Sequence, residues 1–179
     1  MDIKAILARI ERGDRSAFAE LVRHFQRPLF GYLGRMGLRQ GQAEEVAQDT
    51  FLRAWQHLSA YRAERAEFST WLFTIARNLA LNELGRASNS REWPVGDDLP
   101  DAACERVQPP DAVSDTQDRD RLRQALMALP ADDRSALALA YFKELDMAAI
   151  ALIEGCTAGA IKVRLHRAKQ RLRQLLEST

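Results

Sequence analysis

Long apolar runs and cysteine frameworks are both missing from this chain. No stretch of 18 or more consecutive apolar residues occurs among its 179 residues, which argues against a membrane-spanning helix. The two cysteines, Cys104 and Cys156, are too few for a disulfide scaffold and lack zinc-ligand spacing. The first 15 residues carry charges too early and too often for a signal peptide. We therefore expect a cytoplasmic protein with no metal, no cofactor and no membrane insertion.

An excess of one charge is also missing, because 26 Lys and Arg face 25 Asp and Glu. No alternating apolar–polar run is long enough to predict a strand. Apolar residues instead repeat at helical spacing almost throughout, so the sequence predicts an all-α fold.

Four helices are predicted in the first half of the chain. An apolar stripe over 3–10 stops at Gly13-Asp14, and Ser16 can cap a second helix that Pro28 interrupts or kinks. A third helix runs from about 42 to 57 and a fourth from about 70 to 86. The predicted inner face of the third helix consists of Val46, Ala47, Leu52 and Trp55 or their neighbours.

The composition changes between residues 87 and 117. This stretch holds four of the six prolines and seven acidic residues against two arginines. Such a composition is typical of a flexible tether, whereas a long structureless loop within one compact domain is uncommon. We therefore divide the chain into a helical domain over 1–87, an acidic Pro-rich linker over 88–117 and a second helical domain over 118–179.

The second domain ends in a basic helix. The segment 155–173 carries six Lys and Arg and no acidic residue. Its apolar residues recur at spacings of four and three, which predicts one buried seam with the basic side chains lying off it. Gly155 can supply the turn and Thr157 the cap of this helix. The buried seam consists of Ile161, Leu165, Ala168, Leu172 and Leu175.

A short helix, a Gly-containing turn and a basic second helix together match a helix-turn-helix. Its second helix lies in the major groove of DNA, where Arg and Lys neutralise phosphates and bond guanine. A basic amphipathic helix is also compatible with a plain solvated face, a membrane surface or an acidic partner. The apolar seam of Ile, Leu and Ala lacks the bulky aromatics of a membrane-surface helix.

Three strings in this order resemble the extracytoplasmic-function (ECF) sigma factors, bacterial transcription initiation factors that keep only conserved regions 2 and 4. They are AEEVAQDTFLRAWQHL (43–58), FSTWLFTIARNLALNEL (68–84) and GCTAGAIKVRLHRAK (155–169). The resemblance implies a protein that binds RNA polymerase core, recognises promoter DNA and is held inactive by an anti-sigma factor. It also implies that the chain is not an enzyme.

The first string resembles region 2.2, which docks on the clamp helices of the polymerase β′ subunit. The resemblance implies that Glu45, Gln48 and Asp49 are polymerase contacts, with Arg53 beside them. From the residues alone, this polar face would be interpreted as ordinary solvated surface.

The second string resembles regions 2.3 and 2.4, which open the duplex and hold the non-template strand of the −10 element. Asn78 and Asn82 lie four residues apart and so share a helical face from which amides can bond an unstacked base. Arg77 or Arg86 can hold phosphates. Trp71 can stack on a base, as can Phe68 and Phe73, although core packing is the more ordinary role of Trp71 and Phe73.

The third string resembles region 4.2, which reads the −35 element. The resemblance places six residues at the DNA: Lys162, Val163, Arg164, His166, Arg167 and Lys169. Members of the family often have Thr and Ser where this chain has Ala160 and Val163, so two hydroxyls are missing and a methyl contact to thymine replaces one. This difference bears on the promoter sequence that is read.

Two other functions fit parts of the sequence. A helix-turn-helix regulator acting without being a polymerase subunit would bind duplex DNA by itself and would have no use for the Gln48–Asp49 face. An enzyme would need Cys156 paired with a histidine such as His24, His57 or His166, but Cys156 falls in the predicted turn, where a small buried residue is ordinary.

Overall fold

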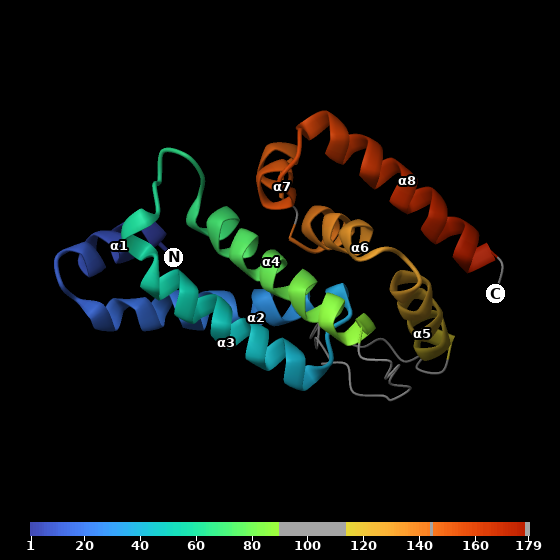
Figure 1. Ribbon diagram of the computed structural model, residues 1–179, viewed down its shortest axis with the longest axis horizontal. Coiled ribbons are helices and arrows are strands. Elements are labelled where there is room, and N and C mark those ends of the chain that lie inside the picture. The colour runs from blue at the N-terminus through green and yellow to red at the C-terminus, as the bar shows by residue number, and fades with distance from the viewer. Residues whose placement is uncertain (90–113, 144, 178–179) are drawn as a thin grey trace.

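The computed structural model describes residues 1–89, 114–143 and 145–177, and within these ranges it contains eight α-helices and no strand (Figure 1). The all-α prediction is confirmed. The predicted linker falls largely on residues 90–113, outside the described residues. The helices are α1 Ile3–Glu11, α2 Phe18–Met36, α3 Gln40–Gln56, α4 Phe68–Asn89, α5 Ser114–Met127, α6 Ala131–Leu137, α7 Met147–Glu154 and α8 Ala158–Glu177.

Helices α2, α3 and α4 form the core of the N-terminal half. Each contributes a stripe of fully buried side chains, such as Leu29 and Leu33 from α2, Ala54 from α3 and Leu72 and Phe73 from α4. Burial of each large apolar side chain stabilises the fold by roughly 1.5–3 kcal/mol. The helix-spaced apolar pattern of the sequence is thus the packing surface of this half.

One local prediction for α2, the Ser16 cap, is wrong, and of the two alternatives predicted for Pro28 the interruption is excluded. A proline inside a helix costs about 3 kcal/mol. The helix nevertheless runs through Pro28 without interruption, because the buried residues Phe25 and Leu29 hold it against its neighbours. Ser16 does not cap α2: its hydroxyl donates to Asp14 Oδ1 over 2.6 Å, within a short 3₁₀ turn that leads into the helix.

The predicted inner face of α3 is correct for Val46 and Ala47, which are buried, but wrong for Leu52, which is 51% exposed.

Leu33 of α2 is fully buried, so Leu33→Ala should lower the free energy of unfolding by about 2–5 kcal/mol through the cavity it leaves. Leu52→Ala, the same chemical change on the surface, should change it by less than about 0.5 kcal/mol. Urea denaturation of both variants followed by circular dichroism measures the difference, and equal losses would contradict the assigned packing.

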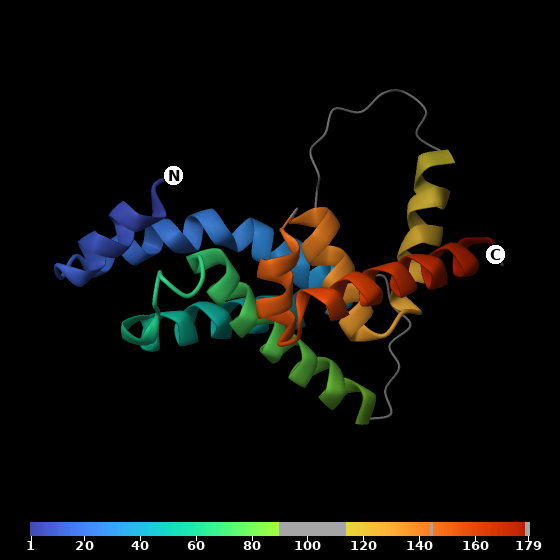
Figure 2. The same ribbon diagram turned by 90° about the horizontal axis from the view of Figure 1, so that it is seen from above.

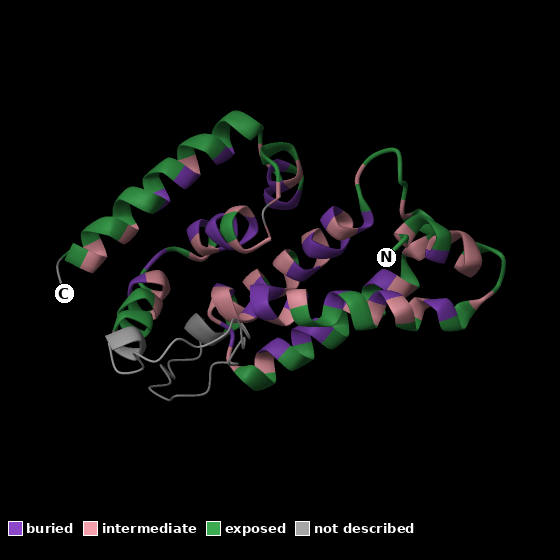
Figure 3. Ribbon diagram, turned by 180° about the vertical axis from the view of Figure 1, so that it is seen from behind, coloured by how far each residue is buried: buried purple, intermediate pink, exposed green. Residues whose placement is uncertain are grey.

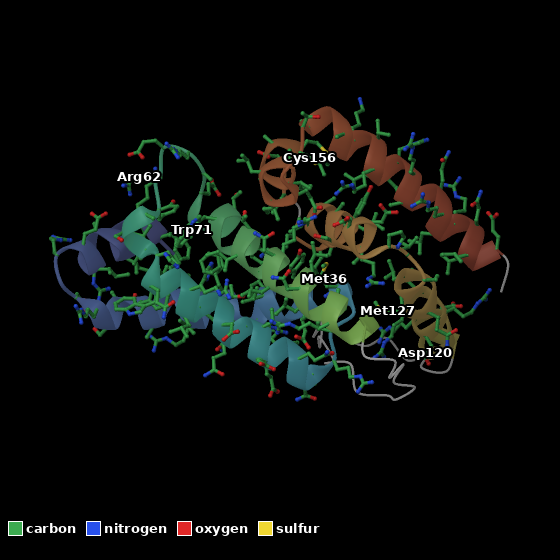
Figure 4. All side chains as sticks on the ribbon, viewed as in Figure 1. Met36, Arg62, Trp71, Asp120, Met127 and Cys156 are labelled. Carbon is green, nitrogen blue, oxygen red and sulfur yellow. The ribbon has the colours of Figure 1, made fainter. Side chains whose placement is uncertain are left out.

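The C-terminal half contains the predicted helix-turn-helix, formed by α7 and α8. Asp146 caps α7 by accepting a hydrogen bond from the Ala149 N–H at 2.7 Å, and Gly155 ends the helix with φ +64°. Thr157 caps α8 as predicted, because its Oγ1 accepts from the Ala160 N–H at 3.2 Å. Cys156 lies half-buried in the turn between the two helices (Figure 4).

The two halves pack directly against each other. Figure 2 shows α6 and α7 lying over α2 and α4, and one continuous cluster of buried side chains includes residues of both halves. Phe142, in the π-helical turn Ala138–Phe142 (η3) after α6, reaches α2 so closely that a Cβ on Gly31 would lie 2.6 Å from its ring. The sequence predicted two tethered modules but gave no sign of this contact.

Candidate functional site

The polar face of α3 is exposed along its length. Glu45, Gln48 and Asp49 point to solvent, opposite the buried Val46 and Ala47. Arg53 is also exposed on this helix. All four residues of the predicted polymerase face are therefore accessible, and the helix is held from behind by its buried side.

Leu52 belongs to this α3 face as well. It follows Gln48 by four residues and Asp49 by three, so it shares their side of the helix, and half of its side chain is in solvent. A large apolar side chain within an acidic and amide surface is typical of the centre of a protein–protein contact. The sequence prediction missed Leu52 because it assigned this residue to the core.

A polar stripe runs along the outer side of α4. Asn78, Asn82 and Arg86 are four residues apart, and all three are exposed. The Arg86 side chain is 81% exposed, and its guanidinium lies 3.8 Å from the Glu83 carboxylate on the same helix. The structure therefore brings three of the five residues predicted to contact the −10 strand onto one accessible surface.

Trp71 is part of an aromatic cluster at the start of α4. Its ring centroid lies 5.3 Å from that of Tyr61 and 5.6 Å from that of Phe68. Phe68 and Phe73 are buried, and Trp71 packs against the same core while keeping part of its surface in solvent, so the expectation of core packing holds for Phe73 and in part for Trp71. A base can reach only the exposed part of the Trp71 ring.

The loop before α4 is held in place by its own side chains. The Tyr61 hydroxyl donates to the Ala66 carbonyl at 3.1 Å, and burial raises the pKa of Tyr61. Arg62 donates to the carbonyls of Ser59 and Tyr61 at 2.6 and 2.9 Å (Figure 4). The loop borders a cavity of about 740 Å³ between α1 and the end of α3.

Arg77 does not lie on the exposed stripe. Its side chain is only 12% exposed, and its guanidinium contacts Asp132 at 2.7 Å and Glu154 at 3.0 Å, both in the C-terminal half. Burial alone would lower the pKa of Arg77, but the hydrogen bond that it donates to Glu154 and the two carboxylate charges raise it. The predicted phosphate contact of Arg77 is therefore not available in this arrangement, because the side chain bridges the two halves.

The outer side of α8 is the basic surface that the sequence predicted. Ile161, Leu165 and Ala168 are buried against the rest of the C-terminal half, and the opposite side is exposed (Figure 3). Five of the six predicted −35 contacts lie on the exposed side: Lys162, Val163, His166, Arg167 and Lys169. Arg164 is half-buried and donates to Glu154 Oε2 at 2.7 Å.

Glu154 is a second residue, after Leu52, that the sequence did not reveal. Its carboxylate is fully buried at the end of α7 and accepts hydrogen bonds from the Ser135 hydroxyl and from Arg164. The one available signal was its position as the only charged residue in the otherwise apolar helix α7. Arg77 and Glu154 lie so far apart in the sequence that no local pattern predicts their contact.

Among the described residues, no group of three or more His, Cys, Asp or Glu is arranged to hold a metal ion. In the same part of the chain, none of the helices combines the length and apolar character needed to cross a membrane.

Two family models match most of the described chain. The model for Sigma-70 region 2 matches residues 21–90, and the model for Sigma-70, region 4 matches residues 119–172. These ranges contain α3 and α4, and α7 and α8, which carry the exposed surfaces described above.

Similar proteins come from several bacteria. The ECF RNA polymerase sigma factor RpoE of Cereibacter sphaeroides is 35% identical over 90% of this chain and 87% of its own. The ECF RNA polymerase sigma factor SigW of Bacillus subtilis is 29% identical over 98% and 97%. The sigma factor RpoE of Bartonella quintana, solved in complex with the anti-sigma factor NepR, has a TM-score of 0.67 at 26% identity over 89% of this chain and 96% of that chain.

Proposed function

The chain belongs to the extracytoplasmic-function (ECF) family of RNA polymerase sigma factors, and on that premise we propose how its residues divide the work of promoter-specific initiation. A sigma factor binds the polymerase core and directs it to promoters. The observation that carries our proposal is that the three family strings each present an exposed polar face on a helix whose other side is buried.

The α3 face docks on the β′ clamp helices of the polymerase. It consists of Glu45, Gln48, Asp49, Leu52 and Arg53. The carboxylates and the amide supply polar contacts, and Leu52 supplies apolar area that is desolvated on docking. Because α3 is packed from behind by α2 and α4, this face is rigid before docking and loses little conformational freedom on binding.

The α4 stripe holds the separated −10 strand. The amides of Asn78 and Asn82 bond base edges, and Arg86 neutralises a phosphate. Trp71 offers only its exposed part to a base. We therefore assign Trp71 a smaller contribution to strand binding than the hydrogen bonds of the two amides. The reaction needs no catalytic residue of this chain, because the polymerase performs the bond formation.

The exposed side of α8 reads the −35 element in the major groove. Lys162, Arg167 and Lys169 supply charge for phosphates or guanine, and His166 a further donor. Val163 is 49% exposed on this side and offers a methyl contact to thymine.

An anti-sigma factor controls the chain in this proposal. The Bartonella quintana relative was solved with such a factor bound, and this chain shares its fold over nearly its whole length. The proposal also places the protein in the cytoplasm, where polymerase and promoters are.

Selection of promoter sequences by the reconstituted holoenzyme tests the proposal. Random duplexes should yield two conserved boxes with a fixed spacing, and permanganate footprinting should detect unpaired thymines only at the downstream box. Enrichment of a single short site that the free chain binds equally well would instead support a regulator that acts without the polymerase.

The double variant Asn78→Ala/Asn82→Ala should reduce open-complex formation about ten- to thirtyfold, since two base hydrogen bonds are lost. Core binding should not change, because neither side chain lies on the α3 face. Gln26→Ala, an exposed amide on α2, is the matched control and should leave both measurements unchanged. Loss of core affinity in the double variant would contradict the assigned role.

A further inference from the structure

Two arginines of the basic helix α8 are paired with buried carboxylates of its own half of the chain. Arg164 Nη1 lies 2.7 Å from Glu154 Oε2 at the end of α7, and Arg171 Nη1 lies 2.7 Å from Asp133 Oδ2 of α6. The Glu154 side chain is fully buried, and only 10% of the Asp133 side chain is exposed. We name these four residues the α8 clamp.

Both arginines of the clamp lie on one side of α8. They are seven residues apart, so they occupy the same side of the helix two turns from each other. Helical geometry places them along one edge of the buried seam, whereas three exposed cations lie along the other edge: Lys162, Lys169 and Arg173. The cations of α8 are therefore divided between those that face carboxylates of neighbouring helices and those that face solvent.

Glu154 connects three helices of the C-terminal half. It belongs to α7, its Oε2 binds Arg164 of α8, and its Oε1 accepts from the Ser135 hydroxyl of α6. Arg77 also lies 3.0 Å from Oε2, but the other two partners come from the same half as Glu154. A buried carboxylate at the C-terminal end of a helix is unfavourable without a cationic partner, because it faces the negative end of the helix dipole and loses its hydration. Arg164 supplies that positive charge from α8.

From this geometry we propose that Arg164 is a positioning residue for −35 recognition, which acts through Glu154 and fixes the rotation of α8 about its axis. The inference rests on the proposed function of α8. Apolar packing along the seam is non-directional, whereas charge-assisted hydrogen bonds have a defined length and direction. Two such bonds, two turns apart, hold α8 in one rotational setting against α6 and α7.

The rotation of α8 decides which contacts its exposed side chains can make. A rotation of about 20° moves an atom that lies about 6 Å from the helix axis by about 2 Å. Hydrogen bonds to base edges require a distance of about 2.7–3.2 Å, so they are lost on such a movement. Attraction to phosphates falls off slowly with distance and persists. A positioning role therefore predicts weaker discrimination between −35 sequences without weaker charge-dependent binding.

The experiment uses the full chain in reconstituted holoenzyme. Gel-shift titration over a series of salt concentrations compares promoters that carry the selected −35 box with promoters that carry single substitutions in it. Glu154→Gln removes the buried carboxylate, and Arg164→Gln removes its partner. Asp146→Asn is the matched control, because it makes the same carboxylate-to-amide change at the other end of α7. Asp146 is exposed and caps the helix, and asparagine caps a helix equally well.

Discrimination is the ratio of the affinities for the intact and the substituted box. We expect Glu154→Gln to lower it about tenfold, and at several positions of the box, as when one base contact is lost. The slope of log K against log salt concentration should not fall, because Glu154 neutralises no phosphate. Glu154→Gln/Arg164→Gln should lose no more than Glu154→Gln alone, since both changes remove the same pair. Asp146→Asn should keep the discrimination of the wild type.

A direct DNA contact of Arg164 gives different results. A slope lowered by about 0.9 in Arg164→Gln, or discrimination lost at a single base pair, would assign Arg164 to the DNA and overturn its positioning role. Unchanged discrimination in Glu154→Gln would overturn it as well. If Glu154→Gln loses helicity by circular dichroism, Asp133→Asn decides, because it weakens the second pair through Arg171, whose side chain is 53% exposed. Asp133→Asn should lower discrimination about threefold with an unchanged slope.

The wild-type holoenzyme separates this inference from the proposed function. If it does not distinguish the intact box from the substituted ones, the proposed −35 role of α8 is refuted, and the positioning role of Arg164 with it. If it distinguishes them and the clamp variants do so equally well, only the positioning role is refuted.

Discussion

Reversing the charge of the α3 face with Glu45→Lys/Asp49→Lys should weaken binding to polymerase core by at least about 100-fold. The two carboxylates lie one turn apart on the exposed face, and their replacement puts like charges against the partner surface that they complement. Because both side chains are in solvent, the free energy of unfolding should change by no more than about 0.5 kcal/mol. Fluorescence titration of labelled chain with core polymerase measures the affinity.

A charge-matched control separates docking from general electrostatics. Glu11→Lys/Glu177→Lys makes the same change at exposed positions on α1 and α8, away from the α3 face. Its affinity for core should stay within about threefold of the wild type, because exposed charges beyond a Debye length are screened. Similar losses in the two double variants would mean that net charge, and not the α3 face, governs binding.

Arg167→Ala should reduce holoenzyme affinity for a promoter with an intact −35 box by about ten- to 100-fold, corresponding to about 1–3 kcal/mol for a base contact. Arg167 is exposed on the outer side of α8, within the N-terminal half of that helix. Arg173→Ala removes the same charge from the same helix two turns later and should cost less than threefold. Gel-shift titration of both holoenzymes measures the ratio.

The salt dependence shows which kind of contact Arg167 makes. Loss of a phosphate contact lowers the slope of log K against log salt concentration by about 0.9 and weakens all sequences alike. Loss of a base contact leaves the slope nearly unchanged and relaxes discrimination at one position of the −35 box. Equal effects of Arg167→Ala and Arg173→Ala in both measurements would refute a docked recognition helix.

Local signals predicted much of the fold. The seam of α8, the Thr157 cap and the Gly155 turn were visible because each depends on residues within a few positions of one another. Leu52 shows where such reasoning ends. Its place in the apolar pattern predicted burial. Whether a residue at the edge of such a pattern is buried depends on where the neighbouring helices pack, and α2 and α4 cover the side of Val46 and Ala47.

The candidate surfaces were predicted through the family strings, and their exposure agrees with that interpretation. Arg77 is the residue whose placement differs most. It shares a helix with Asn78 and was assigned to DNA, yet a rotation of one residue around α4 turns it toward Asp132 and Glu154. Ion pairs between residues 55 or more positions apart leave no periodic trace, so the docking of the two halves required the structure.

Run-off transcription on a template with the selected promoter tests the central claim most directly. Purified core polymerase alone should give no discrete transcript, and core with the wild-type chain should give one transcript from a fixed start. The Glu45→Lys/Asp49→Lys chain should fail at the concentration that suffices for the wild type. A discrete transcript that does not depend on adding the chain, or no transcript in its presence, would contradict the account.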